Sequence, residues 1–260
     1  MKRRQFITLL GGAAAAWPLA ARAQQRALPV IGLLSARSPA VDMPIIAVIR
    51  QGLNEMGFVE GQNVALDYRW AEGQYDRLAG LATDLVRQQV AVIVTMGGDM
   101  SAQAAKATTA TIPIVFAVGS DPIRTGLATS LHRPGGNVTG TSTFIAEMEP
   151  KRLGLLRELR PHATTLAVLV NPGNLAQVEL QVSDIQTAAR SVGQEINILN
   201  ASTIRDINAA FATLAPMRAE ALLVATDAFF FNAWRSLSCW PLDMRFPRCT
   251  PDVSSRLPAA

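Results

Sequence analysis

The sequence predicts an α/β fold in two lobes, each built around a parallel sheet. Short apolar runs of strand length alternate with longer amphipathic segments along most of the chain. This alternation is typical of parallel sheets with right-handed crossovers. The alternation occurs in two series, separated by a stretch rich in glycine, proline and polar residues at 119–137. Hydrophobic residues make up 49% of the 260 residues and charged residues 17%, which allows a substantial core.

The first series predicts lobe 1, residues 27–122. Its apolar runs predict strands at 29–34, 63–70, 90–95 and 113–118. A helix precedes Gly57, because Ile46, Ile49, Leu53 and Met56 share one face at helical spacing. Two further helices are expected near 76–85 and 101–110.

The second series predicts lobe 2, residues 123–231. The predicted strands lie at 138–143, 165–170, 195–199 and 221–225. Apolar residues at helical spacing predict helices at 148–160, 178–192 and 204–214. Ser202 or Thr203 is expected to cap the last of these helices.

The first 23 residues have the pattern of an export signal. Lys2, Arg3 and Arg4 precede an apolar stretch that is too short to span a bilayer, and Ala21-Arg22-Ala23 forms an A-x-A cleavage site. We expect cleavage after Ala23 and a periplasmic product. Arg3-Arg4-Gln5-Phe6 resembles the twin-arginine motif, and an ordinary secretory signal is the alternative. Later segments are shorter than a membrane span, so no stable membrane insertion is expected after signal removal.

The formal net charge of +4 does not indicate a nucleic-acid partner. Four basic residues precede the expected cleavage point, and the remaining chain carries 20 basic and 20 acidic residues. No basic stripe interleaved with aromatic residues follows. Cys239 and Cys249 both lie in the last 22 residues, where a disulfide is one possibility that the core does not require.

Motifs of common enzyme classes are missing from the sequence. No dinucleotide-binding G-x-G-x-x-G follows a strand, and no Walker-type loop or G-x-S-x-G elbow is present. His132 and His162 lie beside prolines in loop-like sequence, and two histidines with two distant cysteines make no spaced metal motif. We therefore expect no catalytic residues, no metal and no cofactor. General acid–base catalysis by a pair such as Asp121 and Asp227 is a less favoured alternative.

The candidate ligand-binding residues follow the predicted strands, because ligands of open α/β sheets bind beyond the carboxyl ends of the strands. Lobe 1 supplies Ser35, Gly97, Asp99, Ser101, Ser120 and Asp121, and lobe 2 supplies Thr141, Ser142, Asn171 and Asp227. The amino terminus of the helix at Ser101 would attract a carboxylate, and Asp227 or Asp121 would take an ammonium. Such a set would hold a zwitterion. Capping and turn formation are the alternative roles for each residue.

Several segments resemble, in order and spacing, the ABC-transporter substrate-binding proteins related to the tryptophan/tyrosine-binding type. The matching segments are Leu53–Val64, Ile112–Phe116, Ser120–Pro122, Gly126–Leu127, Pro134–Gly140, Asn171–Pro172 and the strand that ends at Asp227. The resemblance implies a type I periplasmic-binding-protein fold, in which two Rossmann-like lobes close on a small ligand by hinge motion. It also implies a membrane permease and its ATPase as partners, and an amino-acid-like, aromatic ligand. We expect a monomer.

The family pattern stops after Asn232. Residues 232–260 hold both cysteines and several prolines, and they show no periodicity. We interpret them as an out-of-frame or truncated continuation, which would leave the fold incomplete at the C-terminus and weaken ligand binding; a divergent genuine tail is the alternative. An exported sensory or partner-presenting binding protein, or an exported α/β enzyme, are the other function classes.

Overall fold

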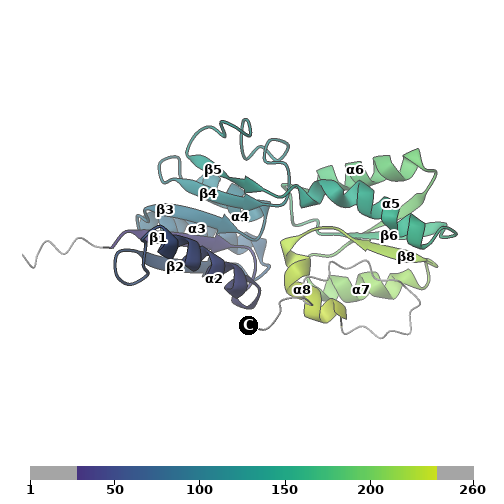
Figure 1. Cartoon of the computed structure of the whole chain (residues 1–260). Coiled ribbons are helices and arrows are strands. Elements are labelled where there is room, and N and C mark those ends of the chain that lie inside the picture. Colours follow the sequence, from purple (N-terminus) through teal and green to yellow (C-terminus); the bar gives the residue numbers. More distant parts are fainter. Residues whose placement is uncertain (1–27, 239–260) are drawn as a thin grey trace, which may run out of the picture.

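The computed structural model describes residues 28–238, and they form two α/β lobes side by side (Figure 1). The predicted signal peptide and both cysteines lie outside the described residues. The first lobe is purple to teal in Figure 1, and the second is green to yellow. No helix among the described residues has the length and apolar character needed to cross a bilayer.

The first lobe has a five-stranded parallel sheet in the order β2-β1-β3-β4-β5. Its strands are β1 (Val30–Ser35), β2 (Ala65–Trp70), β3 (Val92–Met96), β4 (Ile114–Val118) and β5 (Val138–Ser142). Helix α2 (Pro39–Glu55) packs on one face of the sheet through Ile46, which forms a buried cluster with Leu33 and Met96. Helices α3 (Leu78–Arg87) and α4 (Asp99–Thr108) pack on the other face around Leu85 and Ile93.

The second lobe has a three-stranded parallel sheet in the order β7-β6-β8. Its strands are β6 (Thr165–Val170), β7 (Glu195–Asn200) and β8 (Ala221–Val224). Helices α5 (Glu149–Leu159) and α6 (Val178–Ser191) enclose one core with Leu156 and Ile185. Helices α7 (Ile204–Leu214) and α8 (Ala228–Ser238) enclose another on the opposite face, with Ile207 and Phe230. Thr203 is the residue that caps α7.

The strand at 138–142 lies in the first lobe, which corrects the predicted boundary between residues 122 and 123. Strand β5 pairs in parallel with β4. The preceding loop is held on lobe 1, because Leu127 is fully buried in that core and Lys106 Nζ of α4 donates to the Gly126 carbonyl at 2.9 Å. The chain therefore leaves lobe 1 after Ser142, through the short 3₁₀ helix η2 (Ile145–Met148). Strand periodicity alone does not tell which sheet a strand joins.

Helix α8 also differs from the prediction. It continues to Ser238, past Asn232, where the family pattern was predicted to stop. Its first turns face lobe 1: the backbone N–H of Ser38 donates to Asn232 Oδ1 at 3.0 Å. The first residues of the predicted aberrant tail are therefore helical, and Asn232 takes part in the contact between the lobes.

Candidate functional site

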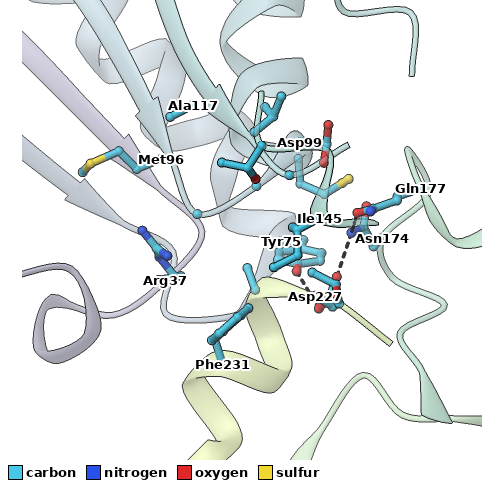
Figure 2. Close-up of a pocket in the computed structure, with 18 of the residues that line it drawn as sticks. Arg37, Tyr75, Met96, Asp99, Ala117, Ile145, Asn174, Gln177, Asp227 and Phe231 are labelled. Carbon is cyan, nitrogen blue, oxygen red and sulfur yellow. Dashed lines mark hydrogen bonds between the residues drawn. The ribbon is translucent and has the colours of Figure 1, made fainter. Parts of the chain in front are cut away.

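A pocket of about 280 Å³ lies between the two lobes (Figure 2). Its walls come from the segments that follow the carboxyl ends of β1, β2, β3, β4, β6 and β8, and from η2. The polar lining residues are Arg37, Tyr75, Asp99, Thr143, Asn174, Gln177, Thr226 and Asp227. Parallel strands place these ends at one edge of each sheet, so both lobes present polar side chains to the same space.

The loop between β3 and α4 forms one wall of the pocket. Gly97 and Gly98 have φ of 75° and 102°, a region that favours glycine. A Cβ on Gly97 would lie 2.7 Å from Ser35 Oγ and 3.0 Å from the Arg37 backbone nitrogen, so the glycine also permits close approach of the loop after β1. Together, these glycines bring the amino terminus of α4 against the pocket.

Asp99 is the first residue of α4 and lines the pocket, although only 2% of it is exposed. Ser120 Oγ donates a hydrogen bond to Asp99 Oδ1. Burial raises the pKa of Asp99, and the bond from Ser120 opposes this shift. A carboxylate at a helix amino terminus also lies in the favourable field of the backbone N–H groups.

Asp227 follows β8 on the lobe 2 wall and accepts four hydrogen bonds. Tyr75 Oη, Asn171 Nδ2 and the Phe229 backbone nitrogen donate to Oδ1 at 2.8, 2.9 and 2.9 Å. Asn174 Nδ2 donates to Oδ2 at 2.7 Å. Burial raises the pKa of Asp227, whereas the side-chain donors act in the opposite direction.

The end of β8 is fixed by a partly buried ion pair in α5. Arg152 Nη1 lies 2.8 Å from Glu149 Oε2, and Arg152 Nη2 donates to the Val224 carbonyl at 2.9 Å. Glu149 Oε1 accepts from the Thr226 backbone nitrogen at 2.8 Å. Burial raises the pKa of Glu149, and Arg152 opposes that shift. These contacts hold the residue immediately before Asp227.

The rest of the lining is mainly apolar. Ile45 of α2, Ile145 of η2 and Phe231 of α8 line the pocket while remaining partly exposed. Arg37 lines it too, but its Nε lies 2.7 Å from Oδ1 of the buried Asp42, so part of its charge is already compensated. Figure 2 shows Arg37 and Asp227 on different sides of the pocket. The arrangement suits a solute with a charged head and an apolar body.

Three of the ten predicted site residues line the pocket, namely Gly97, Asp99 and Asp227. Ser120 and Asn171 lie behind them and donate to the two aspartates. The rest lie outside the lining. Ser35 Oγ accepts from Arg37 N, Ser101 is buried in the first turn of α4, Ser142 Oγ donates to the Ser120 carbonyl, Asp121 Oδ1 accepts from Ile123 N, and Thr141 is exposed on β5.

Sequence reasoning missed Arg37, Tyr75, Asn174, Gln177 and Phe231. Arg37 and Asn174 follow strands by only a few residues, so the same strand-end rule would have included them. Tyr75 begins the 3₁₀ helix η1 (Tyr75–Arg77) after β2, and its partner Asp227 is 152 positions away in the chain. No local pattern signals such a pair.

Within residues 28–238, no group of three or more His, Cys, Asp or Glu side chains is arranged to hold a metal ion. Two parallel-sheet lobes with a partly polar pocket between them define the class of type I periplasmic-binding-protein folds. The chain belongs to the family of ABC transporter substrate binding proteins, whose model matches residues 37–252. That match extends beyond Asn232 and counts against the predicted end of the family pattern at that residue.

Individual relatives agree with this assignment. The tyrosine-binding protein of Clostridioides difficile (strain R20291) is 29% identical over 194 residues, covering 73% of this chain. The chain spans 55% of the length of that protein. A solved ABC domain from Streptococcus pneumonia in complex with L-Trp matches with a TM-score of 0.69 and 24% identity, covering 81% of this chain and 70% of the other. A conserved domain protein from Vibrio cholerae matches with a TM-score of 0.65 and 26% identity, covering 76% and 64%.

Proposed function

We propose that the chain is the periplasmic substrate-binding component of an ABC importer, and that it holds an amino-acid-like solute with an aromatic or large apolar side chain. The observation that carries the proposal is the pocket, which combines buried carboxylates from both lobes with partly exposed Ile45, Ile145 and Phe231. A permease and its ATPase are the partners that such a role requires.

Charge in the pocket supports a zwitterionic ligand. Asp99 and Asp227 are the carboxylates in the lining, and an ammonium beside a buried carboxylate forms a charge-assisted hydrogen bond. Gly98, Asp99 and Met100, where α4 begins, also line the pocket. A helix amino terminus attracts a carboxylate, because its first N–H groups lack intrahelical partners. One ligand with both charges uses both features.

The apolar lining of the pocket and the named relatives support a ligand with a large side chain. Ile45 and Phe231 come from different lobes, so a ring or branched chain between them would be covered when the lobes close. The relatives include a protein named for tyrosine and a domain solved with L-Trp. Export follows from the predicted signal at residues 1–23, and the expected weakening of binding by residues 232–260 stays a prediction.

A thermal-shift screen of the chain from Gln24 onward tests the proposal. L-tryptophan and L-tyrosine should raise the melting temperature saturably, since a ligand at 100 times its Kd stabilises by about 2.7 kcal/mol. Glutamate and lysine, whose side chains carry charge into the apolar part of the pocket, should give little shift. Absence of a shift with every amino acid at millimolar concentration would reject the proposed ligand class.

A further inference from the structure

We propose that Asp227 works as a latch between the lobes through Tyr75, and that Asp99 is the carboxylate that receives the cationic group of a ligand. Of these two roles, only that of Asp99 rests on the proposed function. The latch concerns contacts within the protein and is testable without any ligand.

Asp227 has little capacity left for a ligand. A carboxylate offers about four acceptor positions, and Asp227 already accepts from Tyr75, Asn171, Asn174 and the Phe229 backbone nitrogen. Three of these donors converge on Oδ1. The bond from Phe229, two positions later, also satisfies one of the free N–H groups at the start of α8. These contacts give Asp227 a structural position at the boundary between the lobes.

Tyr75 joins the two lobes in a second way, through its ring. The ring packs against the lobe 1 core that contains Leu78 and Leu85, and also against the lobe 2 core that contains Phe229 and Phe230. Its hydroxyl donates to Asp227 and accepts from the Phe229 backbone nitrogen at 3.3 Å. Separation of the lobes would break both hydrogen bonds and expose the ring.

Neighbouring contacts extend this interface along α8. Asn232 Oδ1 accepts from the Ser38 backbone nitrogen, and a Cβ on Gly73 would lie 3.3 Å from Asn232 Nδ2. Ala228 packs against the lobe 1 core. The latch formed by Asp227 and Tyr75 therefore lies within a continuous interface between the lobes, which is formed by the loops after β1 and β2 and the first turns of α8.

Asp99 differs from Asp227 in its partners. Among the described residues it has one side-chain donor, Ser120, although it lines the same pocket. Arg37, the pocket cation, is paired with Asp42. Asp99 thus keeps acceptor capacity toward the pocket, and a ligand ammonium can use it without displacing an interlobe bond.

Small-angle X-ray scattering of the ligand-free protein tests the latch. The wild-type curve should fit the structure, and Tyr75→Phe, which removes only the hydroxyl, should increase the radius of gyration. Tyr68→Phe is the matched control, because the Tyr68 hydroxyl lies beside Arg50 in lobe 1. Identical curves for Tyr75→Phe and wild type, or a wild-type curve already fitted only by separated lobes, would overturn the latch.

Calorimetry with L-tryptophan and its deaminated analogue indole-3-propionate tests the role of Asp99. Asp99→Asn should reduce the ratio of the two affinities at least tenfold, with Asp84→Asn in α3 as the control. Tyr75→Phe should weaken both ligands by a similar factor of about five and leave that ratio unchanged. An unchanged ratio in Asp99→Asn would refute its role. If wild type binds neither probe, the proposed function fails for this ligand class and the assignment of Asp99 fails with it, while the scattering result still decides the latch.

Discussion

Arg124 of lobe 1 forms a two-pronged ion pair with Asp184 of lobe 2. Arg124 Nη1 and Nη2 donate to Asp184 Oδ2 and Oδ1 at 2.8 and 3.1 Å. Arg124 also binds Glu147 of η2, the segment through which the chain leaves lobe 1. The loop after β4 is thereby tied both to the connection and to α6, at contacts separate from the Tyr75–Asp227 pair.

Arg124→Ala should weaken the contact between the lobes modestly. The Arg124 side chain is 36% exposed, and ion pairs of this kind contribute up to about 1 kcal/mol. We expect up to about a fivefold loss of ligand affinity at low salt and a smaller loss at 0.5 M NaCl, because salt screens exposed charges. Calorimetry at two salt concentrations measures this. Arg87→Ala, which removes a pair within α3 at 3.8 Å, should change neither value.

Gly140→Ala should destabilise lobe 1 strongly. A Cβ at residue 140 would lie 2.0 Å from the Phe116 carbonyl oxygen, so β4 and β5 would have to separate. We expect a loss of at least about 3 kcal/mol in the free energy of unfolding, measured by urea denaturation. Gly154→Ala in α5 is the control, since nothing lies within 4 Å of its Cβ position. It should gain about 0.5–1 kcal/mol, and equal effects at the two positions would contradict the pairing of β5 with β4.

Thr203→Ala should cost about 1 kcal/mol of unfolding free energy, because it removes the cap of α7. Thr203 Oγ1 accepts from the Asp206 backbone nitrogen at 3.2 Å, and Asp206 Oδ2 accepts from the Thr203 backbone nitrogen at 2.9 Å. Thr203→Ser keeps the oxygen and should restore most of the loss. A serine variant as unstable as the alanine variant would show that the capping bond is not the cause.

The dependence of stability on pH should differ in sign between two aspartates. Burial raises the pKa of Asp99 in the folded protein above its ordinary value of 3.8. The contribution of Asp99 to the free energy of unfolding is therefore complete below pH 3.8, and it is lost as the pH rises through the pKa of the folded state. The melting temperature of Asp99→Asn relative to wild type should therefore increase from pH 3.5 to pH 8. The backbone N–H of Ser202 lowers the pKa of Asp206, so Asp206→Asn should lose relative stability over the same range. Parallel trends in the two variants would contradict these assignments.

The sequence predicted the strands and helices well, because apolar runs and helical spacing are local signals. The strand at 165–170 and the helix at 204–214 have the predicted bounds. The assignment of β5 to lobe 1 depended on the contacts of Leu127 and Gly140 with other segments of that lobe. Sequence periodicity does not reveal such contacts. In the site, the strand-end rule located Asp99 and Asp227, while Tyr75 depended on a contact across 152 positions.

Calorimetric titration of L-tryptophan tests most directly whether the pocket between the lobes binds the ligand. Ala117 of β4 lines the pocket, and Val115 lies two residues earlier on the same face of the strand, 37% exposed and outside the lining. Wild type and Val115→Trp should bind one molecule per chain, whereas Ala117→Trp should bind none and retain the wild-type melting temperature. Binding of L-tryptophan to Ala117→Trp with wild-type affinity, or no binding to wild type, would contradict the account.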